Sequence, residues 1–93
     1  MTRLRIVSWF LRKDYDLFKR LSPDDSSLPE TFEEWLEFAE KRIAEYETKG
    51  VAIRKVAIRP HRFAGYCDAR GLNRNRLARD AFAVHVSKDI DQG

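Results

Sequence analysis

Apolar segments of two kinds alternate along the chain, and they predict two strands and four helices. Residues 3–11, RLRIVSWFL, are rich in β-branched and aromatic side chains and predict a strand that is apolar on both faces. Residues 51–60, VAIRKVAIRP, predict a second strand, which Pro60 ends because proline has no N–H to donate to a sheet. Helices are expected at residues 14–21, at 31–49, at 60–70 and from Asn73 or Asn75 to residue 88.

The segment 31–49 carries the clearest helix signal. Thr31 and Glu34 have the spacing of a capping box, and Gly50 is placed to end the helix. Its apolar side chains recur at intervals of three, four and seven, which predicts one core-facing stripe. The stripe consists of Phe32, Trp35, Leu36, Ala39, Ile43 and Tyr46.

The other three helices are predicted from shorter signals. Asp14 is expected to cap the first helix, and Gly71 followed by Leu72 to end the third in a left-handed conformation. The last helix is expected to carry a broad apolar face. This face consists of Leu77, Ala81, Val84 and His85.

The resulting order is β-α-α-β-α-α, which is an α+β fold with a small two-stranded sheet packed on helices. Two helices between the strands suggest an even number of chain reversals, so we expect the strands to be antiparallel. Two strands alone are marginal and leave open edges. We favour a homodimer in which two chains join edges into a four-stranded sheet, with Val7 and Trp9 at the interface; the alternative is that one strand is short and covered.

The composition indicates one soluble domain. With 93 residues the chain forms a single compact domain at residues 1–88, followed by a frayed tail at residues 89–93. One cysteine excludes an internal disulfide and fits a reducing compartment. The longest early apolar run, IVSWFL, is too short for a signal peptide or a membrane span. We therefore expect a cytoplasmic protein that does not enter membranes.

Charge is distributed unevenly along the chain. Residues 14–47 contain eleven acidic and four basic side chains, whereas residues 49–88 contain ten basic and two acidic ones. Such asymmetry is typical of a protein with a nucleic-acid or acidic partner, but it also arises when two halves of a fold neutralise each other.

Residues 63–83, FAGYCDARGLNRNRLARDAFA, are compatible with a helix-turn-helix. Gly71 would lie in the turn, and Leu72 and Leu77 would seat the second helix. This alternative function, nucleic-acid binding, would use the basic side chains of this half of the chain. They are Arg74, Arg76 and Arg79, supported by Arg62, Arg70 and Lys55. Against it, helix pairs of this length are common in proteins that never bind nucleic acid.

No convincing catalytic or metal-binding pattern is present. Cys67, with His61 or His85 as a base, is the only nucleophile hypothesis, and Cys67 lies on the apolar side of its helix. The spacing of these three residues matches no compact zinc motif. We therefore expect neither an enzyme, nor a metal, nor another cofactor.

Three segments, DYDLFKRL, LPETFEEWLEFAE and residues 63–83, resemble those of a family of small, uncharacterised bacterial proteins. The resemblance covers nearly the whole chain and implies a fold, but no activity, cofactor or partner. The chain departs from that family at Arg59, where an acidic residue is usual, and at Tyr66, where tryptophan is usual. The shared positions are Asp14, Tyr15, Leu28, Pro29, Thr31, Glu34, Trp35, Leu36, Pro60, Phe63, Cys67, Gly71, Ala78 and Arg79.

The sequence therefore favours a non-enzymatic interaction module with an unidentified protein partner, and nucleic-acid binding is the alternative.

Overall fold

The computed structural model describes the backbone of residues 3–23 and 25–92 and the side chains of residues 3–23 and 25–88. It has the α+β architecture and the order of elements expected from the sequence. Residues 89–92, expected to form a tail, continue the last helix, and Gly93 lies outside the described residues. The elements are β1 (Arg3–Trp9), a short 3-10 helix η1 (Arg12–Asp14), α1 (Tyr15–Leu21), α2 (Phe32–Thr48), β2 (Val51–Ala57), α3 (Pro60–Arg70) and α4 (Arg76–Gln92).

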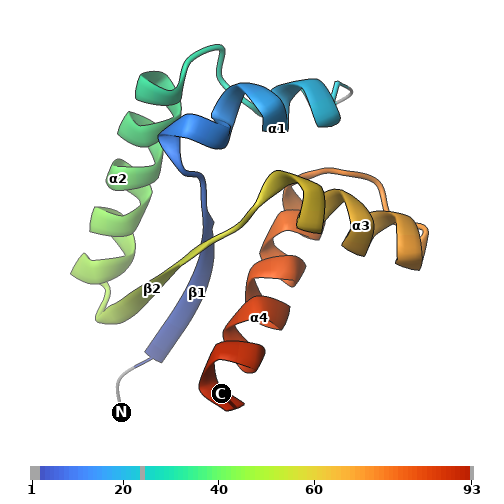
Figure 1. The fold of residues 1–93 in the computed structure, drawn as a ribbon. Helices are drawn as coiled ribbons and strands as arrows, with labels where there is room; N and C mark the ends of the chain where they lie inside the picture. The colour runs from blue at the N-terminus through green and yellow to red at the C-terminus, as the bar shows by residue number, and fades with distance from the viewer. Residues whose placement is uncertain (1–2, 24, 93) are drawn as a thin grey trace.

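The two strands pair in parallel, so the expected antiparallel sheet is wrong. The register runs from Arg3 beside Val51 to Trp9 beside Ala57. The expectation counted each helix between the strands as one reversal of the chain. However, α1 has only seven residues and lies across the ends of the strands (Figure 1). The 17 residues of α2, about 25 Å long at 1.5 Å per residue, make the whole return to the start of β2.

The long helices lie on opposite sides of the sheet. In Figure 1 the strands pass between α2 and α4, and α1 and α3 lie together at the end where both strands finish. α2 packs mainly on β2, whereas α4 packs mainly on β1. The chain thus forms the same unit twice, a strand followed by a short helix and a long helix, and each long helix crosses onto the other unit's strand.

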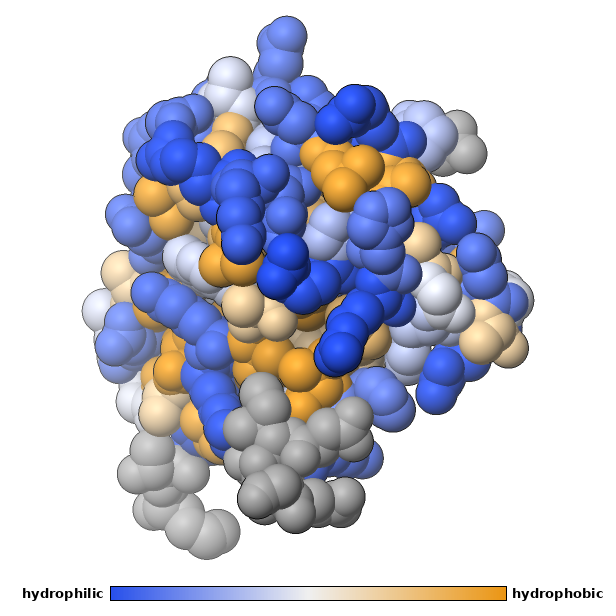
Figure 2. Space-filling model, viewed as in Figure 1, coloured by the Kyte–Doolittle hydropathy of each residue, from blue (hydrophilic) through white to orange (hydrophobic). Residues whose placement is uncertain are grey.

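The core lies where the short helices meet α4 and the ends of the strands. Phe63 is fully buried, with its ring centroid 5.8 Å from that of Phe18 and 5.9 Å from that of Phe82. Phe10 extends this aromatic cluster at 4.7 Å from Phe18. Cys67 is also fully buried, in agreement with its expected position on an apolar helix face. On the face shown in Figure 2, hydrophobic residues reach the surface near the centre and at the upper right, with hydrophilic residues around them.

α4 buries a different face from the one predicted. Leu77 is 80% exposed and Val84 38%, whereas Ala78, Phe82 and Ala83 are buried. Apolar residues occur on several sides of this helix, so their spacing alone does not determine which side packs on the sheet. The prediction of this face was wrong because contact with β1 decides it.

Local signals at the helix ends are confirmed. The hydroxyl of Thr31 accepts a hydrogen bond from the Glu34 N–H at 3.1 Å. Asn75 caps α4 by accepting from the Ala78 N–H at 3.1 Å. Gly71 has φ 64°, a left-handed conformation that glycine adopts without a steric penalty. These ends were predictable because each depends on residues adjacent in sequence.

Asp14 precedes α1, but its side chain makes no capping hydrogen bond. Its carboxylate Oδ2 lies 2.9 Å from Nε of Arg59, the residue before α3. Asp14 therefore joins the start of α1 to the start of α3 rather than capping its own helix.

Candidate functional site

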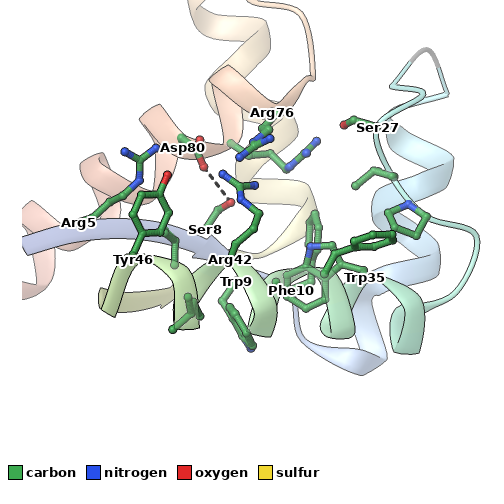
Figure 3. Close-up of a pocket in the computed structure, with 17 residues that line it drawn as sticks. Arg5, Ser8, Trp9, Phe10, Ser27, Trp35, Arg42, Tyr46, Arg76 and Asp80 are labelled. Atoms are coloured by element: carbon green, nitrogen blue, oxygen red, sulfur yellow. Dashed lines mark hydrogen bonds between the residues drawn. The ribbon is translucent and has the colours of Figure 1, made fainter. Parts of the chain in front are cut away.

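A groove follows the outer edge of β1, with α2 on one side and α4 on the other (Figure 3). Its volume is about 350 Å³, within the range of ligand pockets. Residues from both faces of β1 line it and no residue of β2 does, which places it at the strand's edge rather than over the sheet. The loop residues Ser27, Leu28 and Pro29 contribute to its lining as well.

The edge of β1 along this groove is not paired with another strand of the described chain. Trp9 accepts a hydrogen bond from the Ile58 N–H at 3.1 Å, so the backbone groups of Trp9 point toward β2. Because these groups alternate in direction along a strand, the N–H and C=O of Leu4, Ile6 and Ser8 point away from β2. A row of hydrogen-bonding groups is therefore available to another extended segment.

The wall formed by α2 is apolar and incompletely covered. Trp35, Ile43 and Tyr46 belong to the stripe predicted for the core, but no residue of α2 is fully buried. Phe38 lies beside the stripe, lines the groove and is 62% exposed. The stripe therefore serves two purposes, since one flank packs on β2 and the other forms the groove wall.

Arginine side chains surround the groove. The Arg5 guanidinium lies 4.8 Å from the ring centroid of Tyr46. Arg42 is exposed on α2 and Arg76 is exposed at the start of α4. Among the described side chains, Asp80 is the only carboxylate of the lining, and it accepts a hydrogen bond from the Ser8 hydroxyl at 3.3 Å. Three exposed cations against one carboxylate give the groove a positive rim.

A buried ion pair anchors the loop at one end of the groove. Arg79 pairs with Asp25, and their side chains are 6% and 5% exposed. The Arg79 guanidinium also lies 5.4 Å from the ring centroid of Phe10. Burial would raise the pKa of Asp25, but hydrogen bonds from Ser27 and Arg79 outweigh it and lower the pKa below its ordinary 3.8. The pair thus holds the loop against α4 in its charged form.

Tyr15 fixes the other side of the same loop. Its hydroxyl donates a hydrogen bond to the carbonyl of Pro29, while its ring is almost fully buried. Burial raises the pKa of Tyr15 from 10.0 to about 12, although the positive charge of Arg79 opposes this. The neutral phenol is therefore the form that the folded protein stabilises.

We predict that Tyr15 ionises near pH 12 and that its ionisation lowers the free energy of unfolding at alkaline pH. Because its pKa is raised in the folded state, its contribution is complete below pH 10 and is lost as the pH rises from 10 to 12. Phenolate absorbance of the wild type minus that of Tyr15→Phe isolates this titration. A difference curve centred near pH 10 would contradict the prediction.

The six basic residues proposed for nucleic-acid binding have different surroundings. Arg79 is buried, and Arg74 donates to the Leu21 carbonyl at 2.9 Å and to Asp68 at 3.1 Å. Arg76 remains exposed beside the groove. Lys55 lies 4.4 Å from the ring centroid of Trp9, Arg70 lies 4.0 Å from that of Tyr66, and Arg62 is exposed on α3.

The predicted seat of a helix-turn-helix is not formed by Leu72 and Leu77. These side chains are 42% and 80% exposed, whereas the motif requires both to pack inward. Arg74, which precedes α4, and Arg79 on α4 are also held within the chain, by Asp68 and Asp25.

Val7 and Trp9, expected at a homodimer interface, both line the groove and are half-buried. The ring of Trp9 packs edge-on against Trp35 with centroids 4.8 Å apart. Both residues thus lie at the open edge of the sheet, as the dimer prediction requires, but the dimer itself stays a prediction.

The catalytic hypothesis finds little support around Cys67. The thiol is fully buried, and burial raises its pKa, which disfavours the reactive thiolate. No group of three or more potential metal ligands occurs within the described part of the chain. None of the helices described is both long and apolar enough to cross a membrane.

The groove residues that sequence reasoning missed include Arg5, Phe38, Arg42 and Asp80. Phe38 and Arg42 are one helical turn apart on the flank of the α2 stripe, and an aromatic residue outside an otherwise regular stripe is a signal that was available. Arg5 and Asp80 carry no such signal, because only the fold brings them to the same edge.

Comparisons of the chain with models of known families, with curated proteins and with solved structures find no match.

Proposed function

We propose that this protein is a non-enzymatic interaction module that binds an extended segment of a partner protein in the groove along β1. The observation that carries the proposal is an unpaired strand edge lying inside a groove with an apolar wall. Extended peptides bind such edges through main-chain hydrogen bonds, while neighbouring pockets select their side chains.

The geometry favours this function over the nucleic-acid alternative. Four of the six residues, Lys55, Arg62, Arg70 and Arg76, remain as exposed cations for that alternative, but Arg74 and Arg79 are engaged by Asp68 and Asp25. Homodimerisation through Val7 and Trp9 would occupy the same edge, so it competes with peptide binding instead of supporting it.

A larger side chain on the α2 wall would obstruct the groove. Ala39 lines the groove on α2, so Ala39→Trp places an indole in the cavity. Ala44 is exposed elsewhere on the same helix and provides the matched control Ala44→Trp. Both variants add the same side chain to α2, and only one of them obstructs the groove.

Selection from a displayed library of random linear peptides tests the proposal. We expect peptides enriched on the wild type to bind Ala44→Trp equally well and to lose at least about tenfold in affinity for Ala39→Trp, since the indole occupies their site. Thermal unfolding confirms that both variants are folded. Peptides that bind both variants equally, or a library that yields none, would reject the groove as the binding site.

A further inference from the structure

Two arginines from opposite walls of the groove extend toward each other. Arg42 reaches from α2 toward Arg76 on α4, across the edge of β1 (Figure 3). No ion pair joins either guanidinium to a carboxylate among the described side chains, and Asp80 is hydrogen-bonded to Ser8. Two cations next to an apolar cavity, with Asp80 as the one carboxylate of the described lining, create a net positive potential at that point.

Their surroundings favour a carboxylate between them. Guanidinium groups bind carboxylates through paired, charge-assisted hydrogen bonds, which are stronger than neutral ones. The α2 wall beside Arg42 is apolar at Trp35 and Phe38, so it accepts the apolar side chains of a ligand.

An extended segment can place acidic side chains near the arginines and apolar side chains on the α2 wall, because its side chains alternate in direction. Alternate side chains of an extended segment point to opposite sides, and here one side is the apolar α2 wall and the other is the start of α4 with Arg76. A segment with alternating apolar and acidic residues satisfies both walls at once.

We propose, on the premise that the groove is a peptide site, that its occupant is an acidic segment of a partner protein. It adds to β1 as a third strand, hydrogen-bonds to Leu4, Ile6 and Ser8, and places one carboxylate between Arg42 and Arg76. A second copy of this chain fits less well, because a two-fold axis at the β1 edge would bring the arginine rims of two grooves together.

Both tryptophans of the chain, Trp9 and Trp35, line the groove, so intrinsic fluorescence reports directly on its occupancy. The probe is a blocked peptide of alternating valine and glutamate, equal in length to β1. Its controls are the valine–glutamine and valine–lysine peptides. We expect saturable binding of the glutamate peptide, binding at least about tenfold weaker for the glutamine peptide, and none for the lysine peptide.

Variants of the protein test the two arginines. Arg42→Gln and Arg76→Gln should each lower the affinity for the glutamate peptide about tenfold. Arg62 is an exposed arginine of α3, and Arg62→Gln should leave this affinity unchanged. In addition, the amide protons of Leu4, Ile6 and Ser8 should exchange more slowly with the peptide bound, since an added strand takes them as donors.

Several results would overturn this inference. The first three concern the peptide: equal binding of the glutamate and glutamine peptides, peptide affinity that neither arginine variant changes, or unchanged hydrogen exchange at the three amides. The other two concern a different occupant: a dimer, seen in light scattering, that already protects those amides, or arginine-dependent binding of a single-stranded oligonucleotide in place of the peptide. Library peptides that depend on the open groove but carry no acidic residue would reject the acidic occupant and leave the proposed function standing. Indifference to Ala39→Trp would reject both.

Discussion

Phe63→Ala should lower the free energy of unfolding by about 3–5 kcal/mol. Phe63 is fully buried between Phe18 and Phe82, so it joins α1, α3 and α4 in one cluster. Its removal loses the transfer free energy of the ring and leaves a cavity. Domains of this size are stable by about 5–15 kcal/mol, so the variant should be marginally folded. Urea unfolding followed by tryptophan fluorescence measures the change.

The matched control is Phe38→Ala. Phe38 is also on a helix, but it is 62% exposed, so the same substitution should change stability by less than about 1 kcal/mol. If Phe63→Ala is too unstable to measure, Phe63→Leu should still cost about 1 kcal/mol. Similar losses at positions 38 and 63 would contradict the placement of the core. Phe38→Ala should instead lower the affinity of the groove for its ligands.

Local structure was predictable because its causes are local. The Thr31 cap of α2, the left-handed Gly71 and the proline at the start of α3 each depend on a few consecutive residues. For the same reason both strands and all four helices were found close to their observed positions.

Relations between elements were less predictable. Whether the strands run parallel depends on the short length of α1, whose seven residues cross the strand ends and do not return along them. Which face of α4 is buried depends on its contact with β1, since apolar residues such as Leu77 and Phe82 occur on different sides of that helix. The spacing of apolar residues along the chain predicts neither the relative direction of the strands nor the buried face of α4.

The candidate site was found only in part, for a similar reason. Val7 and Trp9 were selected as residues of an exposed sheet edge, and they do line the groove. Arg42 resembles any solvated arginine in sequence, and it becomes notable only when the fold places it opposite Arg76. Arg79 was grouped with the exposed cations because nothing in the sequence links it to Asp25, which is 54 positions away.

Arg79→Met should destabilise the protein by about 3 kcal/mol or more at neutral pH. The substitution leaves the carboxylate of Asp25, only 5% exposed, without its cation, and methionine preserves much of the apolar contact with Phe10. Because Asp25 has a lowered pKa in the folded protein, its contribution is complete above about pH 4 and is lost as the pH falls below that value. Chemical unfolding at pH 7 and at pH 3 should therefore show a smaller difference between variant and wild type at the lower pH.

Two controls separate the buried charge from the loss of an arginine. Adding Asp25→Asn to Arg79→Met removes the unpaired charge while the amide oxygen still accepts from Ser27, so the double variant should be more stable than Arg79→Met alone. Lys41→Met breaks an exposed pair with Glu37 and should cost no more than about 0.5 kcal/mol. A double variant no more stable than Arg79→Met would mean that the contact of Arg79 with Phe10, and not its pairing with Asp25, holds the loop at the end of the groove.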